Sequence, residues 1–143
     1  VTAACGVAAA TRIPLTHRDH AHALTFVTGH LRDGTMDLDW PSLARPGHTL
    51  VVYMGLAGLP ELARELVAHG LPASTPVAVV QQGTLPSQRV VRATLATIAG
   101  RVAAAGLAPP TLVVVGDVVS VADELWAVAP TAAAGADYSL AAD

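Results

Sequence analysis

The sequence has one cysteine and few aromatic residues, and each of these shortages removes a class of function. Because Cys5 stands alone, neither a disulfide framework nor a cysteine-based metal site can form within one chain. Only 3% of the residues are aromatic, which is too few for a platform on which nucleic-acid bases stack. The net charge of -3 is the opposite of the basic face that nucleic acid requires, so we expect no nucleic-acid partner.

The chain also lacks long hydrophobic runs and a leader-like beginning. No apolar run approaches the roughly 20 residues that a membrane-spanning helix needs, so we expect no membrane partner. The first residues show no basic start followed by an apolar stretch and a cleavage site, which predicts a cytoplasmic protein. What is present is a chain of 143 residues, 52% hydrophobic and 13% charged, long enough for one domain with a packed core.

Segments with strand-like and helix-like apolar patterns alternate along the chain. Residues 59–69 place apolar side chains at helical spacing, and the Ala-rich start has Thr2 as its expected N-terminal cap. This alternation predicts an α/β fold with a mixed β-sheet flanked by helices, because strands 76–81 and 88–95 are close enough in sequence to form a hairpin. In full, we expect strands at 23–28, 49–53, 76–81, 88–95 and 111–115, and helices at 2–10, 41–44, 59–69, 97–105 and 118–128.

Glycines follow three of the expected strands, at Gly55, Gly83 and Gly116. Ligands of open α/β sheets collect beyond the carboxyl ends of strands, and glycine lets them approach the main chain because it has no Cβ. Ordinary turn preferences explain any one of these glycines, so three at equivalent strand ends indicate a ligand site only weakly. Their spacing fits neither a G-x-G-x-x-G fingerprint nor a Walker loop, which disfavours dinucleotide and P-loop phosphate binding.

Met54 lies between the expected strand 49–53 and Gly55 and admits two interpretations. Its flexible thioether is suited to filling gaps in a core. The same polarizable group at a strand exit is suited to lying against a nucleobase or a sulfonium group. The residue alone does not decide between them.

Three histidines lie close together at His17, His20 and His22, with Arg18 and Asp19 between the first two. They admit a metal-binding module as one hypothesis, but the spacing of a loop that runs into a strand does not make the three side chains converge. A polar loop is the alternative, in which Arg18 and Asp19 hold the loop in shape or Arg18 meets an anionic substrate.

Several segments, taken together and in order, resemble one family. They resemble the uroporphyrinogen-III C-methyltransferases, a group of tetrapyrrole methylases, from residue 2 to about residue 126. Precorrin-4 methylases share the general order of these segments, but their motif residues resemble this sequence less well. The segments are 2–4 (TAA), 13–19 (IPLTHRD), 27–30 (VTGH), 50–55 (LVVYMG), 82–84 (QGT), 88–90 (QRV) and 110–116 (PTLVVVG).

The resemblance implies an activity, a cofactor and an assembly. Members of this family are two-domain homodimers that bind S-adenosylmethionine in the cleft between their domains. They methylate two ring carbons of uroporphyrinogen III, and the product, precorrin-2, is the branch point towards siroheme and cobalamin. The fold is then expected to resemble the second domain of the tetrapyrrole methylases.

By motif position, the resemblance also implies site residues. A polycarboxylate substrate favours arginine near the cleft, which makes Arg18, and more weakly Arg89, a candidate substrate contact, with ordinary surface or interface ion pairs as the alternative. Met54 would contact the cofactor at the cleft, Gly83 would approach it by main chain, and Thr94 and Leu95 would lie near the adenine. The full set of expected cofactor contacts is Thr2, Ala3, Met54, Gly83, Thr94 and Leu95.

The sequence departs from the family pattern in one large respect. It shows neither the Gly-rich first loop nor the Gly-Gly-Asp-Pro cofactor segment of the family's N-terminal domain. We therefore expect residues 1–129 to form the C-terminal domain of a tetrapyrrole methylase, followed by a poorly ordered tail at 130–143, with the N-terminal domain as a missing partner. A non-catalytic interaction or regulatory domain that retains the fold is the alternative.

We predict that the 143-residue chain alone does not methylate uroporphyrinogen III, because the resemblance assigns half of the cleft to the N-terminal domain. The measurement is an anaerobic assay with S-adenosylmethionine and uroporphyrinogen III, read as the absorbance of the methylated products. Turnover by the purified chain would refute the prediction.

Overall fold

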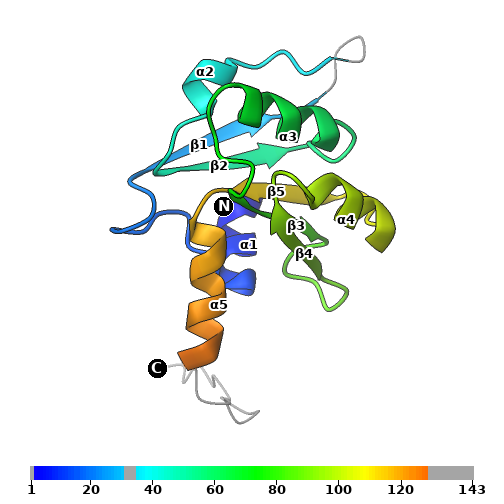
Figure 1. The fold of residues 1–143 in the computed structure, drawn as a ribbon. Coiled ribbons are helices and arrows are strands. Elements are labelled where there is room, and N and C mark those ends of the chain that lie inside the picture. Colours follow the sequence, from blue (N-terminus) through cyan, green and yellow to red (C-terminus); the bar gives the residue numbers. More distant parts are fainter. Residues whose placement is uncertain (1, 31–34, 129–143) are drawn as a thin grey trace, which may run out of the picture.

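The fold is a five-stranded mixed sheet with helices on both faces (Figure 1). The computed structural model describes residues 2–30 and 35–128. The strands are β1 (Ala23–Thr28), β2 (His48–Tyr53), β3 (Pro76–Gln81), β4 (Arg89–Thr94) and β5 (Thr111–Val115). The helices are α1 (Ala3–Thr11), α2 (Trp40–Leu43), α3 (Leu59–Ala68), α4 (Ile98–Ala105) and α5 (Val118–Val128).

The strand order is β1-β2-β5-β3-β4, and the directions are mixed as the sequence predicts. β1 and β2 are parallel, and β3 and β4 form the expected antiparallel hairpin. β5 lies between β2 and β3 and is antiparallel to both. The carboxyl ends of β1, β2 and β3 therefore share one edge of the sheet with the amino ends of β4 and β5.

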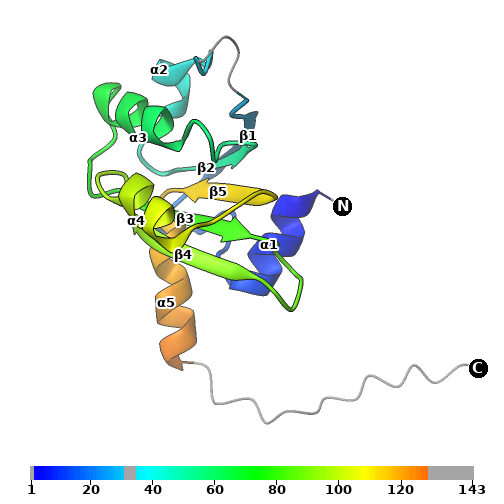
Figure 2. The same cartoon turned by 90° about the vertical axis from the view of Figure 1, so that its right-hand side faces the viewer.

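Each face of the sheet buries its own core. On one face, the sheet packs against α3 and α4 through side chains such as Leu62 and Ile98. On the other face, it packs against α1 and α5 through side chains such as Val7 and Val118 (Figure 2). Because β2, β3 and β5 are covered on both faces, they read as continuous apolar runs and not as alternating ones.

The bounds of most elements agree with the sequence prediction to within one or two residues. β1, β3, β5 and α5 have the predicted bounds, and α4 ends at a left-handed Gly106 as expected. α3 ends at Ala68, one residue early. Among the described residues, no helix is long and apolar enough to cross a membrane. The predicted tail at 130–143 lies outside the described residues.

The prediction that Gly55, Gly83 and Gly116 lie at equivalent strand ends is wrong. Gly55 and Gly83 follow the parallel strands β2 and β3 and lie at the same edge of the sheet. Gly116 follows β5, which runs the opposite way, so it lies at the other edge. There its backbone has φ +137°, and a Cβ would lie 2.9 Å from the carbonyl oxygen of His48. Gly116 is therefore required for close packing of main chain on main chain.

We predict that Gly116→Ala destabilises the fold by at least about 2 kcal/mol, since the new Cβ meets both a disfavoured φ and a backbone atom that cannot give way. Gly100→Ala is the matched control. Gly100 lies inside α4 with open space around it, so its replacement should stabilise the protein by roughly 0.5–1 kcal/mol. Urea denaturation measures both changes, and equal effects of the two substitutions would contradict this account.

Candidate functional site

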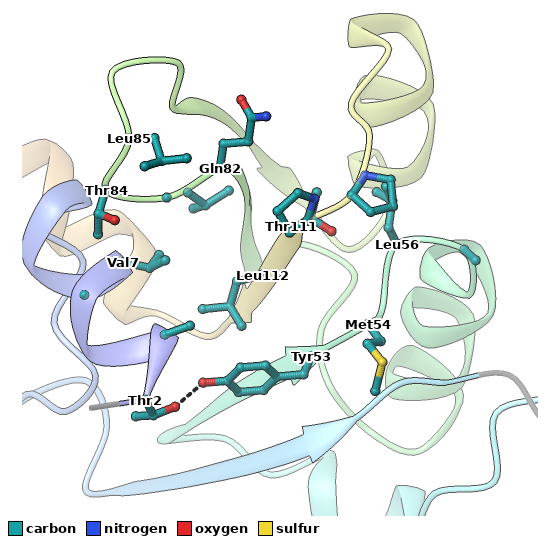
Figure 3. A pocket seen from close by; sticks show the side chains of 17 residues that line it. Thr2, Val7, Tyr53, Met54, Leu56, Gln82, Thr84, Leu85, Thr111 and Leu112 are labelled. Carbon is teal, nitrogen blue, oxygen red and sulfur yellow. Dashed lines mark hydrogen bonds between the residues drawn. The ribbon is translucent and has the colours of Figure 1, made fainter.

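A cavity of about 700 Å³ opens at the sheet edge where β2 and β3 end and β5 begins (Figure 3). Four segments build it, and each arrives from a different part of the chain. They are the first turns of α1, the exit of β2, the β3–β4 loop and the approach to β5. Their lining residues fall within 2–7, 53–57, 80–85 and 109–112.

The walls of this cavity are mostly apolar, with a few hydroxyl and amide groups. Apolar side chains such as Leu56, Leu85 and Leu112 line it beside the polar Thr2 and Gln82. Within the described residues, no charged side chain is among those that line the cavity. A concave apolar site with a few convergent polar groups suits a small organic ligand with an uncharged, partly flat portion.

Tyr53 joins the exit of β2 to the start of α1. Its hydroxyl is in hydrogen-bonding contact with Thr2 Oγ1 and accepts a hydrogen bond from the backbone amide of Ala4 at 3.0 Å (Figure 3). Thr2 occupies the N-cap position that the sequence predicts, but its side chain makes no capping hydrogen bond to the helix. The acceptor at this helix end is therefore the phenol oxygen of a residue that is distant in sequence.

Three residues of the cavity wall have a left-handed backbone that non-glycine residues rarely adopt. They are Met54 with φ 54°, Gln82 with φ 49° and Thr84 with φ 73°. Each such residue costs roughly 1–2 kcal/mol, which the surrounding structure must offset. Among the described residues, the other non-glycine residue with positive φ is Arg12, at the C-terminal cap of α1. Strain gathered at one cavity marks a candidate site.

Met54 is not a core residue, because 60% of its surface is exposed. Its thioether stands at the mouth of the cavity, directly after β2 (Figure 3). The structure therefore removes the core-filling interpretation and leaves a polarizable side chain beside an apolar cavity. That arrangement suits contact with a flat ring or a sulfur-centred group.

Gly83 has a structural role besides lining the cavity. A Cβ on this residue would lie 2.4 Å from Cγ2 of Val7 on α1. The missing Cβ therefore lets α1 pack directly against the β3–β4 loop and bring Thr2 and Ala3 to the cavity.

Of the six residues expected to contact a cofactor, the structure brings four to the cavity: Thr2, Ala3, Met54 and Gly83. Thr94 and Leu95 do not line it. Thr94 pairs with Pro76 at the far end of the β3–β4 ladder, about 16 Å along the strand from the cavity end at 3.3 Å per residue. Leu95 is 4% exposed and belongs to the core beneath α4.

The two candidate arginines also lie away from the cavity lining. Arg18 belongs to a turn closed by the bridge between His17 and Ala21. His22, which follows this turn, donates its amide to the carbonyl of Gly47, and this bond places the turn at the amino ends of β1 and β2. Arg89 donates from Nη2 to the carbonyl oxygen of Ala105 at 2.7 Å, so it holds the end of α4.

The histidine segment forms a local turn. His17 Nδ1 accepts from the Asp19 amide at 3.2 Å, and the rings of His17 and His20 lie 4.9 Å apart. Among the residues that the structure describes, no three histidine, cysteine or acidic side chains come together as a metal site would require. The segment therefore gives the metal-binding hypothesis no support.

Sequence reasoning missed Tyr53 and the approach to β5 as parts of the site. Tyr53 and Thr2 are 51 residues apart, and no local pattern signals their contact. Thr111 and Leu112 reach the cavity because β5 runs antiparallel, which places its amino end where the other central strands end. The one available signal for Tyr53 was its position next to Met54.

Known proteins match this chain in sequence and in structure. A family profile described as "Tetrapyrrole (Corrin/Porphyrin) Methylases" matches residues 1–99. A siroheme synthase from Nitrosospira multiformis is 62% identical over 120 residues, which is 84% of this chain and 25% of that protein. The chain thus spans about a quarter of the length of this relative.

Solved structures share the fold. The crystal structure of uroporphyrin-III C-methyltransferase from Thermus thermophilus, complexed with S-adenosylhomocysteine, is 36% identical with a TM-score of 0.68. The match covers 80% of this chain and 48% of that one. A cobalt precorrin-4 methyltransferase has a TM-score of 0.73 at 21% identity, over 83% of this chain and 50% of that one, and shows the fold alone.

We predict that Gly83→Ala destabilises the protein by about 1–3 kcal/mol, because its Cβ overpacks against Val7. In the double variant with Val7→Ala, the total loss should fall short of the sum of the two single losses by at least about 0.5 kcal/mol. Val102→Ala, on the opposite face of the sheet, is the control and should add to Gly83→Ala without coupling. Additivity in both pairs, measured by urea denaturation, would show that Gly83 does not fit against Val7 as described.

Proposed function

Because the chain belongs to the tetrapyrrole methylase family, we propose that its cavity is one wall of the S-adenosylmethionine site of a C-methyltransferase. The observation that carries the proposal is the convergence of Thr2, Ala3, Met54 and Gly83 on one cavity. These are four positions that the family motifs assign to the cofactor, and they come from three separate segments. Thr94 and Leu95 lie elsewhere, so the proposed wall does not include them.

The cavity fits the nucleoside and thioether portions of such a cofactor. Its apolar walls suit a flat heterocycle, the hydroxyls and the amide of Gln82 supply a few polar contacts, and the exposed sulfur of Met54 stands at the mouth. Bound S-adenosylmethionine supplies an activated methyl group. The contribution of this wall is to orient the cofactor and exclude water, and positioning of this kind can supply about 7–11 kcal/mol of a barrier.

The substrate that we propose is uroporphyrinogen III, with precorrin-2 as the product on the way to siroheme or cobalamin. The support is the identity to siroheme synthases and the likeness to uroporphyrin-III C-methyltransferases. A polycarboxylate needs cationic partners, and those described residues that line the cavity carry no charge. The carboxylates would therefore be met outside this wall, by a second domain, by a second copy in a homodimer, or by Arg18 in such an assembly. We place this reaction in the cytoplasm.

The test is isothermal calorimetry with S-adenosylhomocysteine. We predict weak but measurable binding by the 143-residue chain, and binding about 3–10 times weaker by Met54→Ala, because the variant loses an exposed thioether contact at the cavity mouth. Val67→Ala removes a partly exposed apolar side chain from α3, away from the cavity, and should bind like the unaltered chain.

Two outcomes would count against this function in different ways. Equal affinity of the unaltered chain and Met54→Ala would remove Met54 from the site. No binding by the unaltered, folded chain would contradict the proposed cofactor wall and favour the non-catalytic interaction or regulatory domain.

A further inference from the structure

The hydroxyl of Tyr53 lies between two groups at the start of α1. It accepts from the Ala4 amide and is in hydrogen-bonding contact with Thr2 Oγ1, so one phenol connects the end of β2 with the first turn of the helix. The ring is half-buried and lies against Phe26 of β1, with the ring centroids 6.4 Å apart at an interplanar angle of 59°. The ring is therefore held from the sheet side, and its hydroxyl has a defined position.

The hydrogen bond from Ala4 favours one arrangement of the two hydroxyl protons at this contact. The first amides of a helix have no partner within the helix, and a side-chain oxygen usually accepts from one of them. Here the acceptor is Tyr53, because Thr2 makes no capping bond. A phenol that accepts from an amide becomes a better donor through polarisation along the hydrogen-bond chain. This polarisation favours the arrangement in which Tyr53 donates its own proton to Thr2 Oγ1.

This order leaves the hydroxyl proton of Thr2 for another partner. A hydroxyl has one donor and two acceptor positions, so in this arrangement the contact with Tyr53 occupies an acceptor position of Thr2. Thr2 lines the cavity, so its proton is available to a ligand there (Figure 3).

We propose that Tyr53 is a positioning residue that fixes the Thr2 hydroxyl as a hydrogen-bond donor to an acceptor atom of the ligand. The ligand's identity rests on the proposed function. In S-adenosylmethionine the acceptor would be a carboxylate oxygen, a ribose oxygen or a ring nitrogen. Tyr53 itself acts through Thr2 and through the first turn of α1.

The first experiment removes one oxygen atom. Tyr53→Phe keeps the ring and its contact with Phe26 and should weaken S-adenosylhomocysteine binding about 5- to 20-fold in calorimetry, which corresponds to about 1–1.8 kcal/mol. Thr25→Val is the matched control. It deletes a comparable side-chain hydrogen bond, between Thr25 Oγ1 and His48 Nε2 at 2.7 Å. Neither residue lines the cavity, so the affinity should be unchanged.

A second set of variants separates positioning from general support of the fold. Thr2 is exposed, so Thr2→Ala and Thr2→Ser should both fold. Thr2→Ser keeps the hydroxyl and should bind within about 2-fold of the unaltered chain, whereas Thr2→Ala should bind as weakly as Tyr53→Phe. The double variant Tyr53→Phe with Thr2→Ala should be little weaker than Thr2→Ala alone, because both changes remove one interaction.

Each contrary result has its own meaning. Equal binding by the unaltered chain and Tyr53→Phe, or fully additive losses in the double variant, would overturn the positioning role and leave the proposed function intact. Absence of binding by the unaltered chain would overturn the proposed function. Amide hydrogen exchange of Ala4 tests separately whether the Tyr53 hydroxyl holds the first turn of α1. Tyr53→Phe should raise this exchange rate several-fold, and Thr25→Val should leave it unchanged. An unchanged exchange rate in Tyr53→Phe would overturn the role of this hydroxyl in holding the first turn of α1.

Discussion

The antiparallel pairing of β5 with both β2 and β3 is the constraint on which the rest of the structure depends. β5 is hydrogen-bonded on both sides, and nearly all of its side chains are buried, so it unites the two halves of the sheet. Its direction brings the approach to β5 to the edge where β2 and β3 end. The same direction carries Gly116 to the opposite edge. If β5 ran the other way, its amino end would not line the cavity, and Gly116 would not pack against the main chain of His48.

The sequence predicted the elements well because most of them carry a local signal. The apolar runs of β3 and β5, the helical stripe of α3 and the capping Gly106 are all properties of neighbouring residues. Strand direction has no such signal, since a buried strand reads the same in either orientation. The sequence alone therefore does not distinguish the strand end at Gly116 from those at Gly55 and Gly83.

The candidate site was predictable only in part, for the same physical reason. The motif positions at Met54 and Gly83 each follow a strand, and their place at a sheet edge follows from local pattern. The family motifs also predict Thr94 and Leu95 at the site, whereas the hairpin places them at the end of β4 that is far from the cavity. The contact of Tyr53 with Thr2 depends on how α1 docks, and docking is decided by packing far along the chain, between Val7 and Gly83.

The docking of α1 has a consequence for local stability. A helix of nine residues is marginal by itself in water, so α1 persists because of its contacts with the sheet. α1 forms one side of the cavity, so local opening of α1 alone would remove that side while the sheet stays folded. A ligand that binds only when α1 is docked stabilises the docked state by about 2.7 kcal/mol when the ligand concentration is a hundred times its dissociation constant. Occupancy of the cavity would thus set how long the first segment of the chain survives a protease.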